Sequence, residues 1–237
     1  MAMEVEGKQM SVIANISDNK LQLSEDAYIR LKEGILSGDI VRGKIYTQGQ
    51  IAKILKIAIS PIKVAINKLE SEGLINVFPR SGIQIIDTDF ALTRNTYQLR
   101  VILEREGLKS YIRSVTDKEI NSFKTRHETL REQLYGTSNQ INGQAELAQL
   151  DSELHKKFIL SLDNQIITKS YLANEDLIRL TRLDRLDLAS KEMILSSITE
   201  HIELIDAIAE RDQKSALKCL DEHLAKSIKR AMGLWGF

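Results

Sequence analysis

The chain has 237 residues, 43% of them hydrophobic and 28% charged, a composition that excludes disordered, collagen-like and fibrous proteins. Its 33 lysines and arginines balance its 33 acidic residues, so the overall charge favours neither nucleic acid nor an acidic substrate as a partner. The single cysteine, Cys219, excludes an internal disulfide and a cysteine-rich zinc module. The sequence has no apolar run of roughly 20 residues and no secretory signal, which predicts a cytoplasmic protein without a membrane partner.

Glycine and proline usage divides the chain into parts. Pro61 and Pro79 lie in the first third, whereas the later sequence is proline-free, poor in glycine and rich in leucines at helical spacing. We expect residues 21–88 to form a domain of short elements and residues 89–237 to form an all-helical, antiparallel bundle. Residues 1–20 show no clear periodicity and are expected to be a flexible arm.

The first two helices of the N-terminal domain are predicted from their caps. Ser24 is the candidate cap of the first helix, and Gly38 closes it. Thr47 is the candidate cap of the second helix, with Gln50 in the position that completes a capping box. The second helix is short, and each of the two helices has one apolar face.

A third helix and a β-hairpin complete this domain. Ser60 is the candidate cap of the third helix, with Pro61 at its first position. Two apolar strands over residues 74–78 and 83–86 flank a polar turn at residues 79–82. Three helices followed by a hairpin predict a winged helix-turn-helix.

The local charge of this domain favours nucleic acid. Between Arg42 and Arg80 there are seven basic residues and two acidic ones, although any single lysine is more often part of a solvated surface. The second helix of a helix-turn-helix enters the major groove, which makes double-stranded operator DNA the expected partner. The residues expected at the DNA are Thr47, Lys53, Ser60, Ile62, Lys63, Asn67, Lys68, Arg80, Ser81 and Gly82.

Five runs in this region carry a family resemblance: GDIVRGK (38–44), QIAKIL (50–55), IAISPIKVAI (57–66), LESEGLI (69–75) and PRSG (79–82). They make residues 24–87 similar to the GntR family of bacterial winged-helix repressors. The chain departs from the family pattern at Ala58 and Ile59, where serine and arginine are usual, and at Lys63 and Val64, where arginine and glutamate are usual. Isoleucine cannot supply the bidentate contact of arginine to guanine, so the family's typical operator cannot be assumed.

Four polar residues of the helical domain are spaced so that they can converge. Asp151 and His155, at positions i and i+4, share one helix face. His201 and His223 lie at similar distances on either side of a predicted turn at residues 211–212, which brings them level on an antiparallel helix pair. Three imidazoles and one carboxylate are a donor set for a divalent transition metal such as zinc, nickel or manganese.

The other candidate residues have plainer interpretations. His127 has no partner at helical spacing and is expected to be an exposed histidine. Cys219 is interpreted as a small buried residue rather than a ligand. Arg179, Arg182 and Arg185 are expected to lie on a solvated helix face.

The helical domain also carries a resemblance, through Arg100 with Glu104, Asp151 with His155, Asn164, residues 200–208, residues 211–212, Ala216 and residues 223–224. It is similar to the FCD effector domain of the FadR-type GntR regulators. The one aspartate and three histidines resemble members in which a metal helps bind a small carboxylate effector, and differ from the acyl-CoA-binding members. The resemblance implies that Arg100 faces the effector, although Arg100 and Glu104 are also spaced as an ordinary ion pair.

The leading interpretation is a homodimeric transcriptional repressor in which a carboxylate effector completes the metal shell and changes operator affinity. A dimer is expected because one reading helix makes too few contacts for tight specific binding. One alternative is a metal-dependent hydrolase or lyase, with Glu200 or Glu203 as the candidate base. The other is a metal-free regulator that binds an apolar or acyl ligand.

Overall fold

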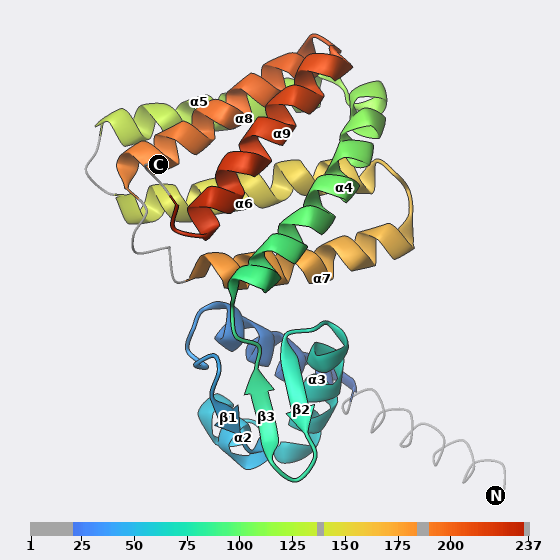
Figure 1. Cartoon of the computed structure of the whole chain (residues 1–237), viewed down its shortest axis with the longest axis vertical. Helices are drawn as coiled ribbons and strands as arrows, with labels where there is room; N and C mark the ends of the chain where they lie inside the picture. Colours follow the sequence, from blue (N-terminus) through green and yellow to red (C-terminus); the bar gives the residue numbers. More distant parts are fainter. Residues whose placement is uncertain (1–20, 137–139, 184–189, 235–237) are drawn as a thin grey trace, which may run out of the picture. The chain divides into compact units, whose positions relative to one another are not determined.

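The computed structural model describes residues 21–136, 140–183 and 190–234 (Figure 1). The chain divides into two compact units, the first ending at Thr88 and the second beginning at Asp89. Helices dominate, which confirms the predicted mainly α fold. Within the described ranges, no helix is long and apolar enough to cross a membrane.

The first unit is a winged helix-turn-helix. Its N-terminal helix is described over residues 21–36 and already contains Ser24, so the predicted cap at Ser24 is wrong. The expected arm, residues 1–20, lies outside the described residues. The remaining elements are β1 (Ile45–Tyr46), α2 (Gln48–Leu55), α3 (Ile59–Ser71), β2 (Ile75–Phe78) and β3 (Gly82–Ile85). Fully buried aliphatic side chains hold the helices together, among them Leu31, Ile35, Ile51, Ile62 and Leu69.

The wing contains one strand more than the sequence predicts. β2 and β3 form the expected antiparallel hairpin, with Phe78 opposite Gly82. β1 pairs with the other edge of β3, which gives the strand order β1-β3-β2. Two residues are too few to show an alternating pattern, so sequence analysis missed β1. Glycine is required at position 82, because φ is 129° there and a Cβ atom would lie 2.7 Å from the carbonyl oxygen of Tyr46.

Caps explain where the two helices of the motif begin. The Thr47 hydroxyl accepts a hydrogen bond from the Gln50 amide at 3.2 Å, and Gln50 Oε1 accepts one from the Thr47 amide at 2.8 Å, which confirms the capping box of α2. The N-cap of α3 is Ala58, without a side-chain hydrogen bond, so the predicted cap at Ser60 is wrong. Pro61 is the third residue of α3, and not the first as predicted. It is tolerated there because the first amides of a helix have no intrahelical acceptor.

The described part of the second unit is built from helices. They are α4 (Phe90–Ser114), α5 (Asp117–Gly136), α6 (Gln140–Leu160), α7 (Gln165–Arg182), α8 (Lys191–Ala209) and α9 (Gln213–Ala231). Asp212 caps α9 by accepting hydrogen bonds from the amides of Lys214 and Ser215, as the sequence predicts for this turn. α8 and α9 therefore pack as the expected antiparallel pair (Figure 1).

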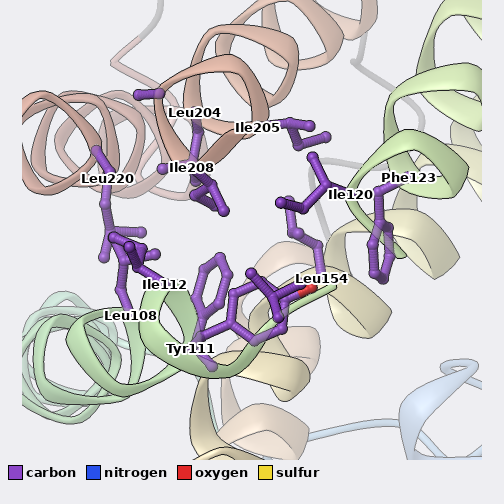
Figure 2. Packing of buried hydrophobic residues seen from close by; sticks show 14 of the residues in the cluster. Leu108, Tyr111, Ile112, Ile120, Phe123, Leu154, Leu204, Ile205, Ile208 and Leu220 are labelled. Atoms are coloured by element: carbon purple, nitrogen blue, oxygen red, sulfur yellow. The ribbon is translucent and has the colours of Figure 1, made fainter. Parts of the chain in front are cut away.

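The core of this unit is an apolar cluster to which α4, α5, α6, α8 and α9 contribute (Figure 2). The rings of Tyr111 on α4 and Phe158 on α6 pack with their centroids 5.4 Å apart. Gly107 lets α4 approach α6 closely, since a Cβ atom there would lie 2.6 Å from the carbonyl oxygen of Phe158. This contact fixes α4 against the helix that carries Asp151 and His155.

Gly107 provides a test of that packing. Gly107→Ala should lower the free energy of unfolding by about 1–3 kcal/mol, because the added methyl group forces α4 and α6 apart. Urea denaturation measures the change. Gly136→Ala is the matched control, since among the described residues a Cβ atom built at Gly136 meets no atom of another element within 4 Å. Equal stability of the two variants would show that the close approach of α4 to α6 is not required.

Candidate metal centre

Four side chains from three helices converge inside the second unit. Asp151 and His155 project from α6, His201 from α8 and His223 from α9. One ligand atom from each of the four lies within 4.8 Å of the others. The structure therefore brings together all four residues that the sequence spacing selects.

The convergence centres on one carboxylate oxygen. Asp151 Oδ1 lies 3.6 Å from His155 Nε2, 3.3 Å from His201 Nε2 and 3.6 Å from His223 Nε2. The three histidines are almost completely inaccessible to solvent, with exposed fractions of 0%, 0% and 2%. These Nε2 atoms are also buried, and they have no hydrogen-bond partner among the described residues.

The other nitrogen of two of these rings is fixed by a carboxylate. His155 Nδ1 donates to Glu104 Oε2 at 2.6 Å, and His223 Nδ1 donates to Glu200 Oε2 at 3.0 Å. Both glutamates are buried, on α4 and α8. Each of these imidazoles therefore has a proton on Nδ1, and its Nε2 faces Asp151.

The third imidazole is fixed through a second histidine. His201 Nδ1 lies 3.1 Å from His127 Nε2, and His127 Nδ1 lies 2.7 Å from the carbonyl oxygen of Phe123. The expectation that His127 is exposed is wrong, because its exposed fraction is 0%. Its partner is remote in the sequence, so spacing along one helix could not reveal it.

Burial favours the neutral form of His201, His155 and His127. Burial lowers the pKa of His201 to about 3 and also lowers the pKa values of His155 and His127. A neutral ring that directs an Nε2 lone pair at the Asp151 carboxylate places one acceptor against another, an arrangement that is costly in a buried site. A divalent cation satisfies all four donors at once, so the residues present fit a metal.

Asp151 divides its two oxygens between the histidines and two arginines. Its Oδ2 lies 3.3 Å from a guanidinium nitrogen of Arg182 and 3.5 Å from one of Arg100. Burial alone would raise the pKa of Asp151, but Arg100 and Arg182 outweigh it and hold the pKa well below its ordinary value. The carboxylate is therefore ionised and keeps Oδ1 available to a cation.

Glu104 connects this site to α4 and α7. It accepts hydrogen bonds from Arg100 Nε at 2.6 Å and Tyr171 OH at 3.0 Å, in addition to the one from His155. Burial opposes ionisation, but Arg100 and His155 lower the pKa of Glu104 to about 2. Glu104 is thus a buried, fully engaged carboxylate that orients one ligand histidine.

A cavity of about 150 Å³ lies beside the four residues. Asp151, His201 and His223 form part of its wall, and the cationic side chains of Arg182 and Arg230 form another part. Apolar and hydroxyl side chains complete it, among them Leu147, Met193, Ile194, Ser197 and Ser227. The cavity can therefore hold a small anion next to the metal ligands.

The arginines of the second unit differ from the sequence expectation. Arg100 does not line the cavity, because its guanidinium is buried against Glu104 and Asp151. Arg182, expected on a solvated face, instead reaches inward and donates to Tyr97 OH and Ser227 Oγ, both at 2.9 Å. Arg179 is exposed as expected, and Arg185 lies outside the described residues. A leucine-interleaved run alone cannot show which arginine faces inward.

The candidate DNA-contacting residues lie mainly on the surface of the first unit. Ser60, Lys63 and Asn67 share the exposed face of α3, and Lys53 is exposed on α2. Ile62 is fully buried in the core, so the expectation that it reaches the bases is wrong. Its position belongs to the apolar stripe that holds α3 in place.

Two further candidates are constrained by their neighbours. Lys68 Nζ lies 3.2 Å from the Glu25 carboxylate and 3.5 Å from the centre of the Tyr28 ring, which directs it towards the N-terminal helix. Arg80 is exposed at the tip of the hairpin with φ of 67°, and Ser81 follows it. Of the remaining candidates, Thr47 caps α2 and Gly82 begins β3.

Comparison with known protein families gives two matches. Residues 23–85 match the bacterial regulatory proteins of the gntR family, and residues 95–226 match the FCD domain. FCD domains commonly bind a metal.

Individual proteins support the same assignment. The HTH-type transcriptional regulator YdhC of Bacillus subtilis is 22% identical over 190 residues, which cover 80% of this chain and 82% of YdhC. The Nta operon transcriptional regulator of Aminobacter aminovorans is 23% identical over 184 residues, covering 78% of this chain and 82% of that protein. The structure of McbR/YncC of E. coli has the same fold, with a TM-score of 0.69 at 14% identity over 92% of this chain and 98% of McbR/YncC.

Glu104 yields a prediction about stability. Glu104→Gln should lower the free energy of unfolding by about 3–5 kcal/mol, because it removes the negative charge that pairs with the buried Arg100 guanidinium and accepts from His155. The pKa of Glu104 is about 2 in the folded chain and 4.5 ordinarily, so its contribution is present above pH 4.5 and lost as the pH falls towards 2.

Urea denaturation at pH 7 and at pH 3 tests both parts. The difference in stability between wild type and Glu104→Gln should be smaller at pH 3. Glu106→Gln, at an exposed position on the same helix, is the control and should change stability little. A Glu104→Gln protein as stable as wild type at pH 7 would contradict the assigned role of this carboxylate.

Proposed function

The chain belongs to the bacterial GntR family of transcriptional regulators with an FCD domain, and we propose that its second unit is a metal-dependent sensor of a small carboxylate that controls operator binding. The family and the names of its relatives indicate a regulator rather than an enzyme, so the hydrolase or lyase alternative is set aside. The observation that carries the proposal is the convergence of three buried imidazole Nε2 atoms on Asp151 Oδ1.

The metal ligands in this proposal are Asp151, His155, His201 and His223. When bound, a zinc, nickel or manganese ion would supply positive charge and open coordination positions for an anion. The chain's own contribution is to fix the donors. Asp151 stays ionised beside two arginines, and each imidazole is held through its Nδ1 atom.

The cavity beside these ligands is the proposed effector site. A carboxylate buried there needs cationic hydrogen-bond donors to offset its desolvation, and Arg182 and Arg230 line the wall. We therefore assign the effector contact to these two arginines instead of Arg100. Ser197 and Ser227 provide hydroxyl groups that suit a hydroxy acid or a sugar acid.

Operator DNA is the proposed partner of the first unit. Lys63 and Asn67 lie on the exposed face of α3, and Arg80 lies at the tip of the wing, which suits contacts to a groove and its flanking phosphates. A homodimer would present two such modules to a two-fold operator. We propose that the protein is a repressor whose effector shifts the population between two arrangements of the dimer, in proportion to its differential affinity for them.

A metal-free regulator of an apolar or acyl ligand remains the second candidate. The apolar side chains of Leu147, Met193 and Ile194 in the cavity wall favour it. Two arginines and three metal-type donors in the same wall favour the carboxylate, because an apolar ligand would desolvate these polar groups without giving them a new hydrogen bond or ligand bond.

The metal assignment predicts stoichiometric binding. Protein incubated with Zn²⁺, Ni²⁺ or Mn²⁺ and then desalted should retain about one ion per chain, measured by elemental analysis. His223→Ala should weaken binding by at least about tenfold, because one imidazole donor is lost. Asp163→Asn, an exposed change in the turn after α6, should bind as wild type. Wild-type protein that retains none of the three metals would contradict the assignment.

The effector assignment predicts metal-dependent stabilisation. Thermal melts with a panel of hydroxy acids, sugar acids and dicarboxylates should reveal at least one acid that raises the melting temperature, with an effect that grows with the logarithm of its concentration. Its uncharged amide is the matched control and should be inactive. A chelator should abolish the effect. Undiminished stabilisation after complete metal removal, or by an acyl compound alone, would favour the second candidate.

The DNA assignment predicts a loss of phosphate contacts. A duplex selected from random sequences by the full-length protein serves as the probe. Lys63→Ala combined with Arg80→Ala should weaken binding and reduce the slope of log K against log salt by about 2, because two contacts that release counterions are lost. Lys169→Ala with Lys218→Ala, on exposed positions of the second unit, is the charge-matched control. An unchanged salt slope in the first variant would reject the proposed surface.

A further inference from the structure

Two kinds of partner support the three ligand imidazoles. Glu104 and Glu200 are negatively charged and accept the Nδ1–H of His155 and His223. In the described part of the chain, the Nδ1 of His201 faces the ring of His127 on α5 instead of a carboxylate. The site is therefore asymmetric in the groups that orient its donors.

The geometry around His127 determines where its proton lies. A carbonyl oxygen can only accept, so the 2.7 Å contact with Phe123 requires a proton on His127 Nδ1. The neutral ring then has a bare Nε2, which must accept the proton of His201 Nδ1 across 3.1 Å. His201 is left with a lone pair on Nε2, the atom that lies 3.3 Å from Asp151 Oδ1.

We propose that His127 is a positioning residue of the metal centre, which holds His201 in the tautomer that can bind a metal and does so without adding a negative charge. Because a neutral imidazole polarises its partner less than a carboxylate does, His201 is the weakest of the three nitrogen donors. The inference rests on the proposed metal site, and it extends that site from α6, α8 and α9 to α5.

A packing role alone does not account for these contacts. The rings of His127 and His201 meet edge to face at 78°, with their centroids 5.1 Å apart, an arrangement that a phenylalanine could also adopt. The two hydrogen bonds are the part that only an imidazole supplies. His127→Phe therefore keeps the ring packing and removes the two hydrogen bonds, which distinguishes a packing role from a role in fixing the proton of His201.

The experiment compares wild type with His127→Phe and His127→Gln. Zn²⁺ affinity is measured by competition with a chromophoric chelator, and ligand geometry by the visible spectrum of the Co²⁺-loaded protein. His127→Phe should bind Zn²⁺ about 10–100-fold more weakly, with an altered Co²⁺ spectrum, because His201 can then place its proton on Nε2. His127→Gln retains an oxygen acceptor and should recover most of the affinity.

Phe123→Leu is the matched control, one turn earlier on α5. It disturbs the same core and leaves the carbonyl oxygen of residue 123 in place, so it should lower stability without changing Zn²⁺ affinity more than about twofold. If His127 had only a packing role, His127→Phe and Phe123→Leu would both lower stability, and neither would weaken Zn²⁺ binding.

A second measurement needs no variant. Two-bond proton–nitrogen spectra of the imidazoles in metal-free wild-type protein report the tautomer of each ring. They should show His201 and His127 both protonated on Nδ1. A proton on His201 Nε2, or Zn²⁺ affinity of His127→Phe equal to that of wild type, would overturn the proposal. Failure of wild-type protein to bind any metal would instead reject the metal assignment, and the tautomer spectrum would still decide the role of His127.

Discussion

Asp151 Oδ1 and three buried imidazole Nε2 atoms face one another inside the second unit, and a hydrogen bond at the other nitrogen of each ring fixes its orientation. Each imidazole is held in this state by a partner on a different helix: α4 supplies Glu104, α8 supplies Glu200 and α5 supplies His127. A cation at the centre would therefore join α4, α5, α6, α8 and α9 into one network. Loading and unloading the site would change the packing of the bundle as a whole, which is the property that a sensor domain needs.

The charges around the centre are arranged so that cations and anions alternate. Arg100 and Arg182 bind the Asp151 oxygen that faces away from the histidines, and Arg230 makes two contacts to Glu200, at 2.9 and 2.8 Å. Arg182 and Arg230 also line the cavity. An anion in that cavity would share Arg182 with the ligand Asp151, and Arg230 with Glu200, which orients His223. Effector binding and metal binding would thus be coupled through the same side chains.

The sequence predicted the parts of the site that depend on spacing along helices. Asp151 and His155 occupy one face at i and i+4, and the Asp212 cap sets the register that makes His201 and His223 level. It could not predict contacts between residues remote in sequence. The sequence pattern predicts that His127 and Arg182 are exposed. In the structure His127 is wholly buried and Arg182 reaches inward, because their partners lie on other helices. In the first unit, the sequence predicted the capping box at Thr47. It could not predict β1, which has only two residues, or the start of α3 at Ala58, whose side chain makes no capping hydrogen bond.

The account depends on one ion among four atoms, and anomalous X-ray scattering tests this directly. Crystals of the protein loaded with Zn²⁺ would be measured on both sides of the zinc absorption edge. The account predicts one strong anomalous peak per chain, within about 2.0–2.2 Å of Asp151 Oδ1 and of the Nε2 atoms of His155, His201 and His223. A well-ordered bundle without a peak there, or a peak bound by other residues, would contradict it.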